Sequence, residues 1–345
     1  MKKWLISVVA MIAVVLVIRG YGHKNEMVHL NGETMGTYYS IKYIKIPGMA
    51  DKAKVQAEID KRLELVNDQM STYRPHSELS RFNQHMSTQP FPVSAAMAKV
   101  VREALRISKL SHGSYDITVG PLVNLWSFGP EARPESIPSD KDLAQRLSEV
   151  GYQNLTLTKD NKLIKKLPNL YMDLSSIAKG YGVDVVGDYL KSLGLKNYMV
   201  DIGGELRVQG NNHDGVPWRI AIEKPLPNER AVQDIIQVGE NGIATSGDYR
   251  NYFEENGVRY SHLINPHTGK PIANHVVSVT VISPSCMTAD AYATAFSVMG
   301  EDESIALANQ EKLPVMLIVK TKDGFKEYAS NTFEQYVSQR NVKHQ

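Results

Sequence analysis

Five short clusters hold the residues most able to do chemistry, because each combines glycine with acids or hydroxyls. They are SYDITVGPLVNLW at 114–126, DLSSIAKGYGVD at 173–184, DIGGE at 201–205, ATSGDYRNYF at 244–253 and SHLINPHTGKPI at 261–272. Glycine beside an acid or a hydroxyl lets the backbone approach a phosphate or an aromatic ring closely. The patterns GxGxxG, GxxxxGK(S/T), HExxH, CxxC and GxSxG do not occur in the sequence, which disfavours the common nucleotide-binding folds.

Asp290 and Thr294 lie in SCMTADAYATA at 285–295, a stretch that is predicted to be helical. At a spacing of four residues, their carboxylate and hydroxyl share one face of the helix. Two hard oxygen donors at that spacing suit Mg²⁺, which takes its remaining ligands from water or substrate phosphates. The alternative is that Thr294 bonds to its own helix backbone and Asp290 is a solvated surface acid.

Lys179 falls in the first turn of a helix predicted to begin near Ser176, just after Asp173 and Ser175. The free N–H groups of a helix N-terminus bind anions, and a lysine there adds a positive charge for a phosphate. Equally, the acid could cap the helix while the lysine is exposed. The cluster alone leaves both interpretations open.

His262 precedes the turn sequence NPHTG and could act as a general base at neutral pH. More often such a histidine is a hydrogen-bonded structural residue. Met35, near a glycine in a predicted strand, and Tyr73, after a predicted helix, could belong to the core. A tyrosine could also stack on a planar ligand.

The elements that must position these residues follow from hydrophobic spacing, caps and turns. Helices are predicted at 51–70, 94–113, 139–151, 176–193, 287–299 and 303–308. Strands are predicted at 31–46 with a break at Gly36, and at 218–222, 234–238, 242–246, 260–264, 276–282, 314–319 and 325–329. The strands cluster along the chain instead of alternating regularly with helices, which predicts an α+β protein.

Bulk composition narrows the possible functions. The 345 residues are 42% hydrophobic and 22% charged, with a formal net charge of +2. These values are typical of a globular protein, and the small net charge does not imply a nucleic-acid partner. Cys286 is the only cysteine, which excludes an intramolecular disulfide and a cysteine-based metal site.

The N-terminus reads as an export signal. Lys2 and Lys3 precede an apolar run from 4 to 18 that Arg19 closes, which is the pattern of a signal peptide or a short membrane anchor. The run is shorter than the roughly 20 residues that span a bilayer comfortably, and no cleavage site of small residues follows it. Either way, we expect residues 1–22 to direct the rest of the chain out of the cytoplasm.

The clusters, taken together and in this order, resemble the ApbE family of FAD:protein FMN transferases. The matching stretches include ETMGTYYS at 33–40, MSTYRPHSELSRFN at 70–83, SGDYRNYF at 246–253 and TADAYATA at 288–295, besides the clusters that begin at 114, 173, 201 and 261. The resemblance covers about residues 28–335, which would form one domain followed by a polar tail at 336–345. It implies a T-fold-like α+β architecture with mixed sheets and packed helices around a cleft for FAD.

Carried over by position, the resemblance implies specific roles. The flavin contacts would be Met35, Tyr73, Ser114, Tyr115, Asp116, Asp173, Lys179 and Ile264. The Mg²⁺ ligands would be Ser176, through its backbone carbonyl, with Asp290 and Thr294, and the catalytic residues would be His262 and Asp290. FAD would be the substrate, and its FMN half would pass to a serine or threonine hydroxyl of another protein.

The resemblance also implies a location and partners. Acceptor proteins would be exported subunits of sodium- or electron-transporting redox complexes, and the enzyme would sit at the periplasmic face of the inner membrane. Many relatives carry a lipobox cysteine after the apolar run, but this sequence has none there, so any tether would be the apolar segment itself. Two other functions stay open: hydrolysis of FAD to FMN and AMP, and flavin binding without catalysis.

Overall fold

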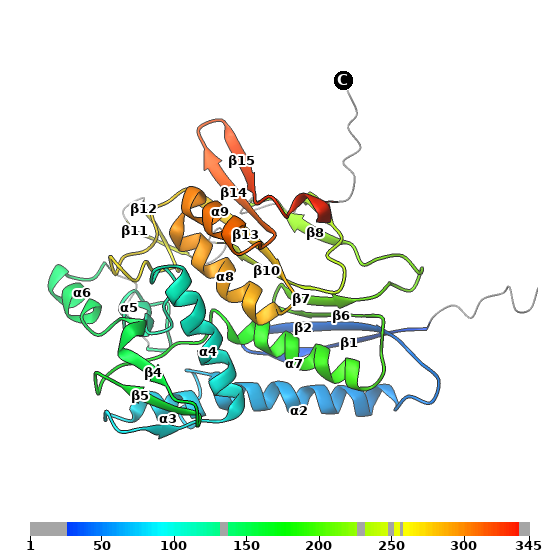
Figure 1. Cartoon of the computed structure of the whole chain (residues 1–345), viewed down its shortest axis with the longest axis horizontal. Helices are drawn as coiled ribbons and strands as arrows, with labels where there is room; N and C mark the ends of the chain where they lie inside the picture. Colours follow the sequence, from blue (N-terminus) through cyan, green and yellow to red (C-terminus); the bar gives the residue numbers. More distant parts are fainter. Residues whose placement is uncertain (1–25, 132–136, 226–231, 248–251, 256–257, 338–345) are drawn as a thin grey trace, which may run out of the picture.

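An eight-stranded antiparallel sheet forms the centre of the protein (Figure 1). The computed structural model describes residues 26–131, 137–225, 232–247, 252–255 and 258–337. In spatial order the strands are β1 (Met27–Thr34), β2 (Thr37–Ile44), β6 (Tyr198–Ile202), β7 (Glu205–Gln209), β10 (Gly242–Gly247), β13 (Val276–Ser283), β14 (Val315–Thr321) and β15 (Gly324–Ala329). Every pairing between described strands is antiparallel, so the expectation of mixed sheets is wrong.

The β1–β2 hairpin turns at two residues, Met35 and Gly36. Both have positive φ, 51° and 70°, and two such residues in a row make the tight turn that matches strand twist. Glycine takes this conformation readily, whereas a methionine is strained there. The predicted break at Gly36 is confirmed, and the neighbouring Met35, at the tip of the turn, is partly buried against the apolar core.

Helices cover one face of the sheet in two layers (Figure 1). The inner layer is α7 (Ala178–Ser192) and α8 (Cys286–Met299), with α9 (Glu301–Gln310) following α8. The outer layer is α2 (Lys52–Met70) and α4 (Ala95–Leu110). The side chains that α2 buries recur every three or four residues, as its sequence predicts: Val55, Ile59, Leu63, Val66 and Met70.

The opposite face of the sheet is covered by smaller elements. The hairpin of β8 (Ile220–Glu223) and β9 (Val232–Ile236) packs there with Phe333 in a separate apolar cluster.

A three-stranded sheet lies beside α4 and consists of β3 (Phe91–Pro92), β5 (Lys162–Lys165) and β4 (Leu155–Leu157). The remaining short elements are α3 (Glu78–Gln84), α5 (Gly120–Leu125), α6 (Asp140–Leu147), β11 (Tyr252–Glu255), β12 (Val258–Ser261) and two 3-10 turns, Tyr152–Asn154 and Glu334–Tyr336.

One cluster of bonds fixes the start of α8 against α7, and we call it the α8 clasp. The Asp184 carboxylate accepts hydrogen bonds from Ser285 Oγ at 2.7 Å, Cys286 N at 3.0 Å and Met287 N at 3.1 Å. Arg207 of β7 donates to the same carboxylate at 3.4 Å. An acid at a helix N-terminus satisfies free N–H groups and complements the helix dipole.

Close contact between the two inner helices continues at Gly180. A Cβ placed there would lie 2.5 Å from the backbone oxygen of Cys286 and 2.8 Å from Cβ of Asp290. Only glycine leaves enough space for α7 and α8 to pack this closely. The first turn of α7 and the second turn of α8 are therefore locked side by side.

The main departures from the predicted elements occur at ends and in short pieces. Helix α7 begins two residues later than expected, at Ala178, and α6 ends at Leu147 instead of near 151. The helices α3 and α5 and the three-stranded sheet were not predicted, because each is too short to show a clear period.

Several predicted features lie outside the described residues. These are the apolar segment at 1–22, most of the tail at 336–345 and the middle of SGDYRNYF. Within the described part of the chain, no helix combines the length and the apolarity needed to cross a membrane.

Candidate functional site

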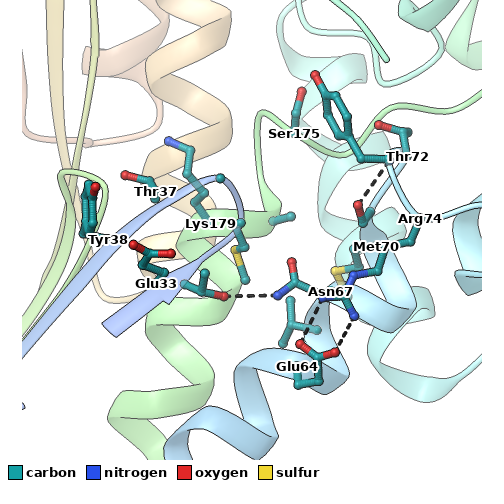
Figure 2. Close-up of a pocket in the computed structure, with 17 residues that line it drawn as sticks. Glu33, Thr37, Tyr38, Glu64, Asn67, Met70, Thr72, Arg74, Ser175 and Lys179 are labelled. Carbon is teal, nitrogen blue, oxygen red and sulfur yellow. Dashed lines mark hydrogen bonds and ion pairs between the residues drawn. The ribbon is translucent and has the colours of Figure 1, made fainter. Parts of the chain in front are cut away.

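Two adjoining hollows open between the β1–β2 turn, the start of α7 and the middle of α8. The smaller hollow has a volume of ≈ 440 Å³ and the larger one ≈ 900 Å³. Tyr73, Ser175 and Lys179 line both, so the two join at these residues. Figure 2 draws the larger hollow, with Lys179 and Ser175 on its wall. A ligand with two parts could lie across both.

The structure brings the residues predicted for the site together. Of these residues, Met35 lines the larger hollow, and Tyr73 and Lys179 lie at the junction. The others line the smaller hollow: Ser114, Tyr115, Asp116, Asp173, Ser176, His262, Ile264, Asp290 and Thr294. They come from segments spread over most of the chain, so their convergence is a property of the fold.

A buried charged cluster occupies one wall of the smaller hollow. Asp290 is 5% exposed, and its Oδ2 accepts the backbone N–H of Gly180 at 2.9 Å. Lys179 Nζ donates to Glu205 Oε1 at 2.5 Å, and Glu205 is 4% exposed. Asp290 is therefore buried, which excludes the interpretation that it is a solvated surface acid.

The charges of this cluster influence one another strongly. Burial raises the pKa of Glu205 to about 8, and the nearby Asp290 adds to the shift while Lys179 opposes it. Burial also raises the pKa of Asp290, against the effect of Lys179 and the Gly180 N–H. Burial disfavours the charge of Lys179, but Asp290 and Glu205 outweigh it and raise its pKa. Two acids thus share one lysine in a poorly solvated place.

Other walls of the smaller hollow are held by bonds within the chain. The Asp116 carboxylate accepts from Thr118 N, Thr118 Oγ1 and Tyr152 N, each at 2.7 Å. Ser176 Oγ donates to the buried hydroxyl of Tyr115 at 3.1 Å. Asp173 Oδ1 accepts from Ser175 N at 2.7 Å, just before α7. Because its carboxylate accepts three bonds from within the chain, Asp116 helps to shape this wall.

His262 lines the smaller hollow from a loop. Strand β12 ends at Ser261, and two side chains then accept bonds from the backbone, Ser261 Oγ from Leu263 N and Asn265 Oδ1 from His267 N. Such local bonds compete with the strand ladder. The strand predicted at 260–264 is thus shorter than expected, and His262 and Ile264 lie beyond its end. Both line the hollow nonetheless.

Comparison with known proteins decides the family. The model of the ApbE family matches residues 35–317. A protein of Vibrio cholerae described as FAD:protein FMN transferase is 58% identical over 98% of this chain and 100% of its own, and one of Haemophilus influenzae with the same description is 47% identical over 97% and 98%. The solved structure of flavin transferase ApbE from Vibrio cholerae covers 90% of this chain and 99% of its own, at 60% identity and a TM-score of 0.86.

This chain belongs to the ApbE family. It shares the mixed α/β fold of the solved ApbE structures and is a transferase. A metal ion is the further component that the resemblance implies. The described residues contain no group of three or more His, Cys, Asp or Glu side chains placed to hold one, so protein groups of those types alone would not complete a site.

The donors that are present nevertheless fit Mg²⁺. Asp290, Thr294 and Ser176 line one hollow and offer a carboxylate, a hydroxyl and a backbone carbonyl. Mg²⁺ is commonly held by one or two carboxylates, with substrate phosphates and water completing its ligands. Among the described atoms, Glu205 Oε2 is buried and has no hydrogen-bond partner. That oxygen is an unused acceptor, which a cation bound beside it would satisfy.

Glu205 is the residue that sequence reasoning missed. The cluster DIGGE was noted, but no member of it received a role. Its two glycines have positive φ, 61° for Gly203 and 102° for Gly204, and they form the turn from β6 into β7. That turn places Glu205 beside Lys179 of α7. The density of glycine beside an acid was the signal that could have identified it.

Proposed function

We propose that this ApbE-family enzyme transfers FMN from FAD to a serine or threonine hydroxyl of an acceptor protein. The acceptor oxygen would form a bond to the FMN-side phosphorus, the bond from that phosphorus to the bridging oxygen would break, and AMP would leave. The observation that carries the proposal is the pair of joined hollows with Lys179 at their junction. A dinucleotide fits such a shape, with a ring system in each hollow and its diphosphate between them.

The residues at the junction would bind and orient FAD. Lys179 offers a positive charge to the diphosphate, at the start of α7 where the helix dipole also favours an anion. Tyr73 is 68% exposed and contributes to both hollows, so its ring is free to stack on a planar group. Met35, at the tip of the β1–β2 turn, would contact the ligand from the other side.

The acid side of the smaller hollow would serve the phosphate chemistry. Asp290, Thr294 and the Ser176 carbonyl would hold Mg²⁺, which when bound neutralises phosphate charge and makes the phosphorus more electrophilic. Asp290 already accepts the Gly180 N–H, and this bond fixes the direction of its carboxylate. Oriented donors of this kind need little rearrangement during the reaction.

His262 would take the proton of the acceptor hydroxyl, because it lines the same hollow as Asp290 and Thr294. Removing a general base lowers rates by roughly 10²–10⁴. We therefore expect His262→Asn to slow transfer on that scale while FAD still binds, as measured by flavin fluorescence. If the variant binds FAD far more weakly yet transfers normally at saturating FAD, then His262 is a binding residue.

Mass spectrometry tests the reaction directly. The enzyme would be incubated with FAD, Mg²⁺ and an exported redox-complex subunit, and the subunit would then be weighed for an added FMN. A matched reaction with EDTA controls for the metal. FMN and AMP free in solution, with no adduct on the subunit, would show that the protein is a hydrolase. FAD that stays intact would show a binding protein.

We also propose that the enzyme works outside the cytoplasm, tethered to the inner membrane through residues 1–22, and modifies exported subunits of redox complexes. The support is the basic flank and apolar run of the sequence. A reporter fused after Gln345 that is active in the cytoplasm, with the native N-terminus present, would contradict this location.

A further inference from the structure

The buried acids near α7 and α8 differ in how completely they are bonded. The Asp184 carboxylate accepts three hydrogen bonds through its two oxygens and contacts Arg207. The Asp116 carboxylate likewise accepts three. Glu205 is as deeply buried but accepts one bond from a side chain, at Oε1, and its Oε2 has no partner among the described atoms. An acid with a structural role alone would be expected to have both oxygens bonded.

Glu205 lies where its unbonded oxygen could contact a ligand. It lines the smaller hollow with Asp290, Thr294 and Ser176. Two buried carboxylates there face one ammonium, that of Lys179, so the wall carries an excess of one negative charge when both acids are ionised. Burying an uncompensated charge costs several kcal/mol, so the wall favours an added positive charge, either a proton on Glu205 or a bound cation in its place.

The partial exposure of Lys179 leaves room for its ammonium to give way to another cation. Its side chain is 32% exposed, whereas that of Glu205 is 5% exposed. It reaches both hollows, so its ammonium can leave Glu205 and still find anionic partners at the junction. The flexible four-carbon stem of a lysine permits such a move.

We propose that Glu205 is a second carboxylate of the divalent-cation site, and that Lys179 is the counter-ion that neutralises this site until the cation binds. Binding of the cation would release the Lys179 ammonium towards the junction, where it would meet a phosphate. The inference rests on the proposed function only in taking the smaller hollow as the site of the divalent cation. It assigns to Glu205 a role that neither the sequence patterns nor the family resemblance gave it.

Metal binding without FAD or acceptor tests this assignment. Mn²⁺ replaces Mg²⁺ as the probe because its electron paramagnetic resonance signal measures the free ion directly. Glu205→Gln keeps the size of the side chain and removes its charge, so Mn²⁺ affinity should fall at least roughly tenfold, as for loss of an anionic partner of a metal. Lys179→Met removes the competing charge, so Mn²⁺ affinity should rise roughly threefold or more.

Two controls keep these results interpretable. Glu103→Gln removes a partly buried acid on α4 that lines neither hollow, and it should leave Mn²⁺ affinity unchanged. Glu205→Asp keeps the charge on a shorter side chain and should restore part of the affinity. ADP serves as a phosphate probe, and Lys179→Met should weaken its binding while strengthening that of Mn²⁺.

The two substitutions are expected to change Mn²⁺ affinity in opposite directions, which makes the outcome decisive. Wild-type Mn²⁺ affinity in Glu205→Gln, or weaker Mn²⁺ binding in Lys179→Met, would overturn the inference. If Glu205→Gln does not fold, Glu205→Asp and Lys179→Met still decide it. Flavin transfer is measured separately by mass spectrometry, so a failure here with intact transfer removes only the role of Glu205, and the converse removes only the proposed reaction.

Discussion

The first two turns of helix α8 lie beside buried acids that are bonded to different extents. At its first turn, the α8 clasp surrounds Asp184 with donors from Ser285, Cys286 and Met287 and with the guanidinium of Arg207. One turn later, Asp290 faces a hollow in which Glu205 has an oxygen without a partner. The same helix thus begins in a saturated cluster, whose acid has both oxygens bonded. It continues into an unsaturated cluster, in which one acid oxygen has no partner among the described atoms.

Within helix α8, the fully bonded cluster would stabilise the fold, and the incompletely bonded cluster would bind a ligand. A buried acid whose donors all belong to the chain stabilises the fold, because its desolvation is offset by the bonds it accepts. A buried acid with unused oxygens destabilises the unliganded fold and gives a ligand something to bind. The substitutions below test whether the two clusters divide the work in this way.

The largest expected effect is on catalysis, from Asp290→Ala. Transfer of FMN should fall by roughly 10³ or more, because the proposed metal site loses a carboxylate. The unfolding free energy should change little, since a costly buried charge is removed together with one hydrogen bond. Transfer would be assayed by mass spectrometry over a range of Mg²⁺, and stability by urea unfolding. Normal transfer at limiting Mg²⁺ would remove Asp290 from the site.

Asp184→Ala should do the reverse: it should lower the unfolding free energy strongly and change FMN transfer by the folded protein little. Removing one partner of a buried ion pair typically costs about 3–5 kcal/mol, and here Arg207 and the first N–H groups of α8 would lose their acceptor. Urea unfolding of this variant and of Asp184→Asn would measure the loss, with the amide expected to lose less. If the alanine variant is as stable as the wild type, the α8 clasp is not a stabilising cluster.

The pH dependence of stability should come from the unsaturated cluster. Burial raises the pKa of Glu205 from 4.5 to about 8. Between these values the folded protein, free of divalent cations, holds one proton more than the unfolded chain. The unfolding free energy should therefore fall as the pH rises through this window. Urea unfolding at several pH values in EDTA would show the slope, and Glu205→Gln should flatten it.

The smallest expected effect concerns the cap of α8. Ser285 Oγ donates to Asp184 and accepts from Thr288 N. Ser285→Ala should lower the unfolding free energy by about 0.5–2 kcal/mol, as for other N-cap serines. Mn²⁺ affinity should stay at the wild-type value, because Asp184 keeps its other donors. A large loss of metal affinity would show that the cap and the hollow are not independent.

Much of the site could be predicted because its motifs are local. The spacing of Asp290 and Thr294 and the hairpin break at Gly36 need only the neighbouring residues, and the structure confirms both the helix and the turn. The resemblance to the ApbE family then set motifs from distant segments in order. The roles of the individual residues stay predictions.

What could not be predicted depends on contacts between distant segments. Nothing local to Asp184 indicates that it caps a helix that begins about a hundred residues later in the chain. Similarly, the partnership of Lys179 and Glu205 depends on the β6–β7 turn meeting α7. The strand expected at 260–264 ends at Ser261, where Ser261 Oγ accepts the Leu263 N–H in place of a continued strand ladder.

The rise and rotation of helix α8 fix where Asp290 lies relative to the α8 clasp. Because an α-helix rises about 1.5 Å and turns about 100° per residue, the distance in sequence from Cys286 in the α8 clasp to Asp290 sets both the depth and the direction of the carboxylate. One alanine inserted between them would keep every motif residue and every bond of the α8 clasp, yet turn Asp290 about 100° away from the hollow. Four inserted residues would bring it back to nearly the same side but about 6 Å too far along. The spacing between the two clusters is therefore as much a part of the site as the residues themselves.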